Sequence, residues 1–137
     1  MTEQALMTLN HDKVREIADA YIAAWNSGSP EAVAAFYAVD GQSVINRGTP
    51  WIGRQAIAGM AAGFFADVPD LALVYDEVRT AGNHVACFWT FTGTHAGTGN
   101  TLRVAGWEEW DLDGDFKVVV SRGWYDTEEY ARQTVPR

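Results

Sequence analysis

The sequence predicts a single α+β domain in which helices cover one face of a curled antiparallel sheet. Apolar residues recur at helical spacing through most of residues 11–66. Aromatic and β-branched runs, separated by turn signals, follow from residue 71 onward. The chain has 137 residues, of which 47% are hydrophobic, and this is enough for one buried core.

Three helices are expected before residue 67. The first spans about residues 11–26 and ends near Gly28. Its apolar stripe consists of Val14, Ile17, Ala18, Tyr21, Ile22 and Trp25. A second helix should open at Ser29-Pro30, because serine caps helices and proline suits the first turn. Its buried face would be Val33, Phe36 and Tyr37, and a third helix over about 53–66 would bury Ile57, Met60, Ala61 and Phe64.

Strands are expected at 42–46, 71–80 and 84–95, and residues 47–53 form a loop that holds Trp51. Alternation along the second and third strands gives one face with Leu71, Leu73, Tyr75, Cys87, Trp89 and Phe91. The other face would carry Val74, Asp76, Val78, Ala86, Phe88 and Thr90. Both faces are partly apolar, so the sheet would be covered on both sides, and a dimer contact is one way to do that.

A final hairpin is predicted around the turn signal Asp113-Gly114-Asp115, followed by a short helix at 127–133. A three-residue loop would place Trp110 opposite Val118 and Glu108 opposite Val120. One apolar face would then hold Leu112, Trp110, Glu108, Gly106, Val118, Val120, Arg122, Trp124 and Asp126. The solvent-facing side would hold Arg103, Glu109, Asp111, Lys117 and Ser121.

Ionisable groups on a buried face cost several kcal/mol unless they are paired or change protonation state. One interpretation is therefore structural: Glu108 pairs diagonally with Arg122, and Asp126 caps the next helix. The other is functional, because catalytic acids with shifted pKa values occupy such sites. The residues alone leave both interpretations open.

Composition excludes several classes of function. The formal net charge of -8 argues against nucleic acid and against anionic membrane surfaces. The single cysteine, Cys87, excludes an internal disulfide. The N-terminus does not resemble a signal peptide and no apolar run is long enough for a membrane span, which favours a cytoplasmic protein. His11, His84 and His95 lack metal-ligand spacing, and no nucleotide fingerprint is present, so we expect neither a metal nor a cofactor.

Several segments together resemble one superfamily. They are Tyr-Ile-Ala-Ala-Trp-Asn-Ser-Gly at 21–28, the stretch 53–70 ending in Val-Pro-Asp, Gly-Thr-His at 93–95, Asp-Gly at 113–114 and 124–126. The chain resembles, over about residues 10–135, the nuclear-transport-factor-two-like superfamily, which includes ketosteroid isomerases and SnoaL-like polyketide cyclases. The resemblance implies one domain over 1–137 with a cystatin-like architecture: a cone-shaped curved antiparallel sheet on three N-terminal helices, enclosing an apolar pocket. Members are commonly homodimers through the sheet.

The resemblance also assigns roles to individual residues. Tyr21 and Glu108 match the oxyanion-binding tyrosine and the protonated acid of ketosteroid isomerases. In those enzymes an apolar site keeps the carboxyl group neutral, so that it can donate a hydrogen bond to a developing enolate. Asn46 stands near the position of the isomerase general base, and asparagine cannot accept a proton at neutral pH. Asp126 matches the acid/base aspartate of SnoaL-like cyclases.

These observations predict cofactor-independent binding of a small hydrophobic molecule, a cyclic carbonyl compound, with proton-transfer chemistry of the isomerase, cyclase or dehydratase type. Asp126 would be the acid or base, while Tyr21 and Glu108 would hold the oxyanion. The expected pocket residues are Asn46, Trp25, Trp89, Trp110, Arg122, Trp124, Phe64 and His95. One alternative is a non-catalytic binding or dimerisation domain. Another is an epoxide hydrolase-like enzyme, which needs an Asp-Arg-Asp set around a water.

Overall fold

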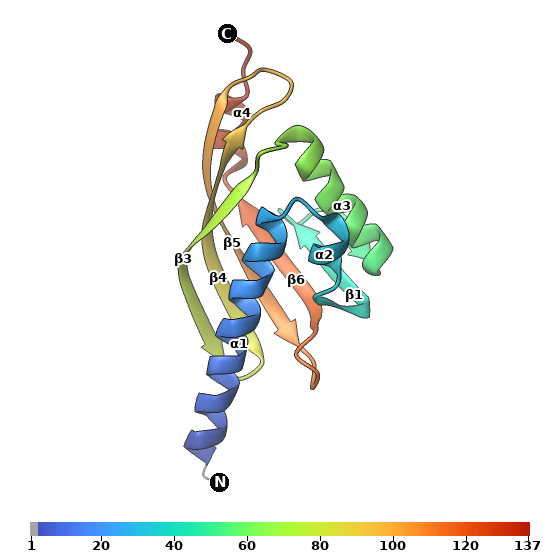
Figure 1. Cartoon of the computed structure of the whole chain (residues 1–137), viewed down its shortest axis with the longest axis vertical. Helices are drawn as coiled ribbons and strands as arrows, with labels where there is room; N and C mark the ends of the chain where they lie inside the picture. The colour runs from blue at the N-terminus through green and yellow to red at the C-terminus, as the bar shows by residue number, and fades with distance from the viewer. Residues whose placement is uncertain (1–2) are drawn as a thin grey trace.

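The computed structural model describes the backbone of residues 3–137 and the side chains of residues 11–137. Four helices and six strands follow one another in the order α1 (Glu3–Asn26), α2 (Pro30–Ala34), β1 (Tyr37–Ile45), β2 (Trp51–Ile52), α3 (Arg54–Asp67), β3 (Ala72–Ala81), β4 (His84–Thr94), β5 (Thr101–Leu112), β6 (Val118–Tyr125) and α4 (Thr127–Gln133). Figure 1 shows α1, α2 and α3 on one side of the sheet. The predicted α+β class, with helices on one face of a curved sheet, is confirmed.

Local signals explain the helix boundaries. Ser29 caps α2 through its side-chain oxygen, which accepts the N–H of Ala32 at 3.2 Å, and Pro30 opens the helix. The helix is shorter than expected, because it ends at Ala34 and Tyr37 already begins β1. The predicted placement of Tyr37 on a helix face is therefore wrong. Its side chain is nevertheless fully buried, as part of the core under the sheet.

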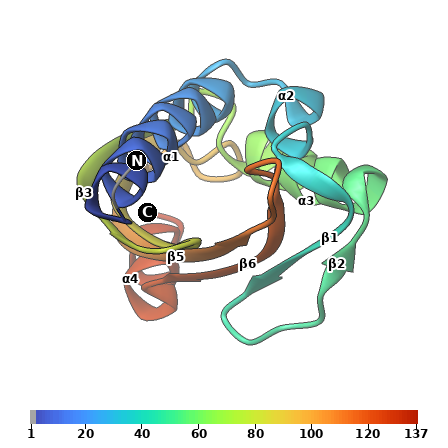
Figure 2. The ribbon, with the colours of Figure 1, turned by 90° about the horizontal axis from the view of Figure 1, so that it is seen from below.

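The six strands form one sheet in the order β2-β1-β6-β5-β4-β3. All neighbouring pairs are antiparallel except β1 and β6, which run parallel. Seen from below, the sheet curves around the helices without closing on itself (Figure 2). A bulge between Tyr75 and Glu77 turns Val78 toward the helices, where it is buried, so its predicted position on the opposite face is wrong.

The last hairpin has a longer loop than its turn signal indicated. Residues 113–117 form the loop, and the Asp113 carboxylate accepts the N–H groups of Asp115 and Lys117 at 2.9 and 3.0 Å. The longer loop shifts the pairing by two residues, and a bulge between Asp111 and Leu112 adds a third, so Ser121 becomes the partner of Trp110 and Gly123 the partner of Glu108. A displacement by an odd number of residues moves side chains to the other face.

The predicted register is thus wrong in a way that matters for function. Ser121 faces the helices with 2% of its surface exposed, although it was expected on the solvent side. Arg122 lies on the opposite, outer face, where it pairs with Asp111 at 3.3 Å. The predicted diagonal ion pair between Glu108 and Arg122 is therefore absent.

The core lies between the inner face of the sheet and the helices. It is built around large, fully buried side chains, among them Trp110, Tyr37, Ile57, Leu102, Val14 and Val33. Among the described residues, no helix has both the length and the apolar character that a membrane crossing requires.

Candidate functional site

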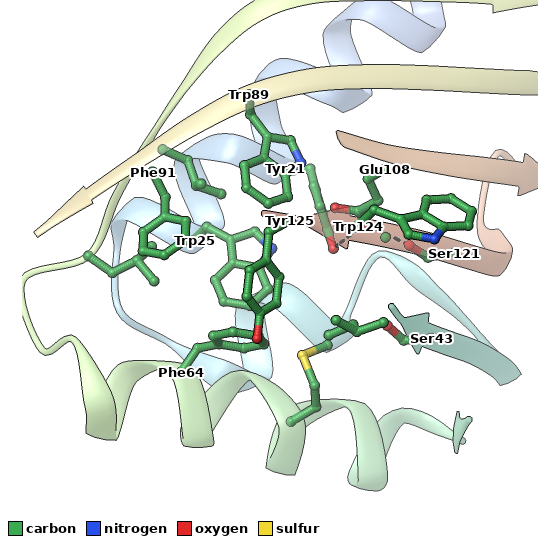
Figure 3. A pocket seen from close by; sticks show the side chains of 15 residues that line it. Tyr21, Trp25, Ser43, Phe64, Trp89, Phe91, Glu108, Ser121, Trp124 and Tyr125 are labelled. Carbon is green, nitrogen blue, oxygen red and sulfur yellow. Dashed lines mark hydrogen bonds between the residues drawn. The ribbon is translucent and has the colours of Figure 1, made fainter. Parts of the chain in front are cut away.

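A pocket opens between the inner face of the sheet and the helices α1 and α3 (Figure 3). It is lined by Tyr21, Trp25, Ser43, Ile45, Met60, Phe64, Leu71, Leu73, Trp89, Phe91, Glu108, Ser121, Gly123, Trp124 and Tyr125. Its free volume is about 70 Å³. This is less than half of the roughly 150 Å³ hole that holds benzene in an engineered protein core. The pocket therefore accepts a compact molecule, or one end of a larger one.

Glu108 is the acidic residue of this lining, and three side chains converge on its Oε1 atom. The Tyr21 hydroxyl donates to it at 2.9 Å, the Trp110 indole N–H at 2.7 Å and the Ser121 hydroxyl at 2.8 Å. In the part of the chain that the structure describes, Oε2 accepts no hydrogen bond from protein. Glu108 is partly buried, so one side of its carboxyl group is fully held and the other stays available to the cavity.

The environment of Glu108 favours its neutral form. Burial raises the pKa of the carboxyl group above its usual value, and the donors on Oε1 offset only part of this effect. Among the residues whose side chains the structure describes, no lysine or arginine lines the pocket to stabilise the anion. A neutral Glu108 can donate a proton from Oε2 into the cavity while Oε1 keeps its three hydrogen bonds.

Tyr21 connects the acid to a second buried hydroxyl. Its oxygen lies 3.1 Å from that of Tyr37, and burial together with the nearby Glu108 raises the pKa of both tyrosines. The Tyr21 ring is fixed by edge contacts to Trp110 at 4.9 Å and Phe36 at 5.5 Å between centroids. Tyr21 is therefore a rigid, neutral donor whose position is set by the aromatic core.

Two tryptophans bring further donors to the cavity wall. The indole nitrogens of Trp25 and Trp89 are buried, and among the described residues neither has a hydrogen-bond partner of normal geometry. Trp89 nevertheless acts on Glu108 as a nearby donor that lowers its pKa, and Trp25 acts on Tyr21 in the same way. In Figure 3 both nitrogens point toward the middle of the pocket, where Tyr21 and Glu108 meet.

A glycine makes room for the Trp89 ring. Gly106 lies opposite Trp89 in the β4–β5 pair, and a Cβ atom at this position would come within 2.4 Å of Trp89 Cη2. The same atom would meet the Trp124 carbonyl oxygen at 2.6 Å. Only glycine allows the indole to lie across the strand here, so this residue helps to shape the pocket.

The predicted site residues divide into two groups. Tyr21, Trp25, Phe64, Trp89 and Glu108 line the pocket. Trp124 also borders it, but its ring stacks on Trp107 on the outer face, so its predicted place on the inner face is wrong. Trp110 stands behind it, fully buried, and holds Glu108. The sequence therefore identified the acid, its tyrosine partner and most of the aromatic wall.

The other predicted residues lie elsewhere. Asp126 is exposed and caps α4 by accepting the N–H of Glu129 at 3.0 Å, so the expectation that it enters the pocket is wrong. Asn46 ends β1 and holds β6, since its side chain accepts the N–H of Tyr125 at 3.1 Å. Arg122 is on the outer face, and His95 bonds Thr98 in the β4–β5 loop. None of these four lines the pocket.

Sequence reasoning missed several pocket residues. Ser121 was lost through the wrong register, and Ser43 could not be distinguished from other short polar residues of a strand. Met60, Leu71, Leu73 and Phe91 were expected in the core, and nothing in a sequence separates a core side chain from one that borders a hollow. Tyr125 had a usable signal, because it precedes the helix cap at Asp126 and ends the last strand.

Among the described residues, no group of three or more histidines, cysteines, aspartates or glutamates could hold a metal ion. The chemistry of the pocket itself is that of one neutral carboxyl group, hydroxyl and indole donors, and aromatic walls. Such a site can bind an apolar molecule through a polar atom and can transfer a proton to it.

The curved sheet and its helical cover form the fold of solved nuclear-transport-factor-two-like proteins. The family model of the SnoaL-like domain matches residues 18–120. The chain therefore belongs to the SnoaL-like domain family, which confirms the resemblance found in the sequence. A search of curated proteins gave no significant match.

Solved structures of low sequence identity share the fold. One is a hypothetical protein of ketosteroid isomerase-like fold from Catenulispora acidiphila, in complex with trimethylamine, with 24% identity, a TM-score of 0.82 and coverage of 89% of this chain and 94% of that one. A putative SnoaL-like polyketide cyclase from Jannaschia sp. has 17% identity, a TM-score of 0.77 and coverage of 89% and 94%. SalBIII, an epoxide hydrolase/cyclase-like enzyme of pyran ring formation in salinomycin, has 14% identity, a TM-score of 0.78 and coverage of 87% and 95%.

Proposed function

We propose that this protein binds a small apolar carbonyl compound in the pocket and transfers protons to and from it through Glu108. The observation that carries this proposal is a single carboxyl group with one oxygen held by three donors and the other facing an aromatic cavity. The neutral acid would donate to the ligand oxygen, and its conjugate base would take a proton from the neighbouring carbon. A positioned carboxyl group contributes about 10²–10⁴-fold to such a step.

This mechanism uses one carboxyl group in both roles. Within residues 11–137 no second carboxylate lines the pocket, since Asp126 is outside and the strand position near Asn46 presents Ser43 and Ile45 instead. A two-acid isomerase mechanism is therefore not supported. The proton would return to the ligand from the same Glu108, which confines the chemistry to shifts between atoms that one carboxyl group can reach.

The test is exchange of the α-protons of cyclopentanone in D₂O, followed by ¹H NMR. Wild-type protein should accelerate exchange over buffer, and Glu108→Gln should lose at least about a hundredfold of that acceleration. The amide keeps a donor toward the ligand oxygen, so cyclopentanone should still bind within about threefold of wild type. Equal exchange rates for wild type and Glu108→Gln would reject the catalytic role.

Asp126→Asn is the matched control. It removes the carboxylate that the sequence favoured, while asparagine remains a good helix cap, so α4 should be preserved. We expect unchanged exchange, because Asp126 is exposed outside the pocket. If only Asp126→Asn lowered the exchange rate, the proton transfer would have to be assigned to Asp126 and not to Glu108.

A small amine is a second candidate ligand. The related structure from Catenulispora acidiphila contains trimethylamine, and aromatic rings beside a carboxyl group suit an organic cation. An ammonium group would need Glu108 in its ionised form, which burial disfavours in the empty protein. Binding of an amine should therefore release a proton, which titrations in buffers of different ionisation enthalpy would detect.

The epoxide hydrolase alternative finds no support in this pocket. That mechanism needs an Asp-Arg-Asp set, whereas Arg122 pairs with Asp111 on the outer face and Asp126 caps a helix. The non-catalytic alternative predicts that the compound binds but does not exchange. The exchange experiment separates this outcome from the proposed one.

We also propose that the outer face of the sheet joins two copies of the chain. Aromatic rings form a row across β4, β5 and β6, where Phe88 stacks on Trp107 at 6.1 Å and Trp107 on Trp124 at 4.2 Å. Beside it, His84, Glu109, Asp111 and Arg122 form an ionic cluster with both signs of charge. A second copy turned about a two-fold axis can match apolar to apolar and opposite charges to one another.

Light scattering after size-exclusion chromatography tests the dimer. We expect a wild-type dimer, and a monomer for Trp107→Glu, which places a charge in the aromatic row. Val135→Glu is the control, because Val135 is exposed beyond α4 and outside the row. A wild-type protein that stays monomeric at a concentration of about 100 μM would contradict the proposal, since stable interfaces bind more tightly than this.

A further inference from the structure

Trp25 and Trp89 carry buried donors that no well-formed hydrogen bond satisfies. Both indole nitrogens are shielded from solvent, and within residues 11–137 neither has a hydrogen-bond partner of normal geometry. A buried donor without a partner costs about 1–3 kcal/mol. The contrast with Trp110 is informative, because its indole N–H makes a 2.7 Å hydrogen bond to Glu108 from within the same core. The fold can satisfy an indole here, whereas Trp89 and Trp25 act on Glu108 and Tyr21 only as nearby donors without a hydrogen bond of normal geometry.

The indole N–H groups of Trp25 and Trp89 lie at the same cavity as Glu108. Trp25 and Trp89 both line the pocket, and their nitrogens point to the region between Tyr21 and Glu108 (Figure 3). Trp25 has 8% of its surface exposed and is held by ring contacts to Phe65 at 5.4 Å and Phe64 at 6.0 Å. Trp89 is held over Gly106. Neither ring is free to turn its N–H toward another partner.

The polar groups that meet beside Glu108 share one character, whereas the hydroxyl groups of Ser43 and Tyr125, which also line the pocket, can both donate and accept. Indole nitrogen can only donate, and a neutral Glu108 donates from Oε2 because Oε1 already accepts three hydrogen bonds. An ammonium ion would set donor against donor beside Glu108, and an alcohol oxygen could accept there but would leave its own O–H in need of an acceptor. A ligand oxygen that only accepts would satisfy the available groups.

We propose that Trp25 and Trp89 are specificity-determining residues, whose indole N–H groups select ligands with an acceptor-only oxygen, such as a ketone or an ester carbonyl, over alcohols and amines of the same size. This inference rests on the proposed function and deepens it, because it names the polar chemistry of the ligand. Trp89, which lies closer to Glu108, would share the ligand oxygen with that carboxyl group. Trp25 would bind a second lone pair or a second oxygen of the same molecule.

The experiment compares four matched probes: cyclopentanone, cyclopentanol, cyclopentylamine and methylcyclopentane. Each is titrated into ¹⁵N-labelled protein, and the indole N–H resonances are assigned through single Trp→Phe variants. With cyclopentanone the Trp25 and Trp89 signals should move to lower field, as hydrogen bonds form. With methylcyclopentane they should not. Trp51 is the internal control, since it lies on β2 outside the pocket.

The variants give a second readout. Trp89→Phe and Trp25→Phe keep an aromatic ring but remove the donor, so each should reduce the preference for cyclopentanone over methylcyclopentane by about fivefold to tenfold. The ratio of two probes cancels the effect of the changed cavity size. Trp51→Phe should leave the ratio unchanged.

The possible failures can be told apart. Ketone binding with unmoved Trp25 and Trp89 signals, or with an unchanged preference in both variants, would overturn this inference and leave the proposed function standing. Tighter binding of cyclopentylamine or cyclopentanol than of cyclopentanone would also overturn it. If none of the four probes perturbed any pocket resonance, both the inference and the proposed function would fall.

Discussion

Glu108 shows how a single residue can serve both stability and chemistry. Its Oε1 atom organises Tyr21, Trp110 and Ser121, which come from a helix and from two strands of the sheet. Without an acceptor here, three donors would be buried together. Its second oxygen, Oε2, remains available to the cavity, so the carboxyl group can act as an acid without losing the hydrogen bonds that stabilise the fold.

Replacement of Glu108 should therefore separate two effects. Glu108→Gln keeps an oxygen acceptor, and we expect a free energy of unfolding within about 1 kcal/mol of wild type. Glu108→Leu leaves the three donors without an acceptor, so the free energy of unfolding should fall by about 3 kcal/mol or more. Urea denaturation measures both. Equal stability of the two variants would show that the hydrogen bonds to Oε1 contribute nothing.

The Glu108 carboxyl group should also make the stability of the protein depend on pH. The pKa of Glu108 is raised in the folded protein, so the native state holds a proton that the unfolded chain releases near its usual pKa of about 4.3. Stability contributed by this residue is thus present at low pH and declines as pH rises from that value through the raised pKa. Glu108→Gln should lack this decline. Urea unfolding at pH 4, 5.5, 7 and 8.5 measures the free energy of unfolding of wild type and of Glu108→Gln. If the wild type became more stable relative to Glu108→Gln as the pH rises, the raised pKa of Glu108 would be contradicted.

What the sequence could reveal at this scale depended on the type of residue. Tyr21 and Trp25 were identifiable because a helical stripe has one buried side, and both are on it. The catalytic role predicted for Asp126 was wrong because a carboxylate at the end of a strand can be either a catalytic acid or a helix cap. Here Asp126 caps α4. Local chemistry alone cannot decide between them, since both uses follow an apolar strand.

At the scale of elements, strand positions were predictable and strand registers were not. The turn signal at 113–114 correctly marked the last hairpin. It did not reveal that Phe116 adopts a positive φ of 59° and that Lys117 belongs to the loop. Those two residues shifted β6 against β5 by two positions, which alone keeps each side chain on its face. The bulge between Asp111 and Leu112 adds one more position, and this odd residue exchanged Ser121 for Arg122 on the inner face.

The β4–β5 pair offers a test of how a strand shapes the pocket. Gly106→Ala would drive a methyl group into the Trp89 ring and the Trp124 carbonyl group, so we expect a loss of about 1–3 kcal/mol in stability. The Trp89 indole resonance should move as well, because its ring must shift. Gly114→Ala is the matched control: it lies in the last hairpin with nothing near its would-be Cβ, and its stability should change by less than about 0.5 kcal/mol. If Gly106→Ala were as stable as wild type, the Trp89 ring would not be in tight contact with residue 106.

For the whole molecule, the α+β class and the cavity between helices and sheet followed from the order and periodicity of the elements. The size of the cavity did not. Six tryptophans and their aromatic neighbours were compatible with an open hollow or a filled one, and rotamers rather than composition decide between them. The outcome is a narrow cavity of about 70 Å³, which restricts the ligand more than the family resemblance does.

The parallel pairing of β1 with β6 also governs the order in which the chain can assemble during synthesis. β1 and β2 emerge early from the ribosome, yet the strand that links them to the rest of the sheet is the last one made (Figure 1). Until about residue 125 leaves the exit tunnel, two sheet fragments remain with open edges. The acid site is subject to the same delay, because Ser121 arrives on that final strand. A nascent chain therefore gains its continuous six-stranded sheet and its complete pocket in one step, once β6 has left the ribosome.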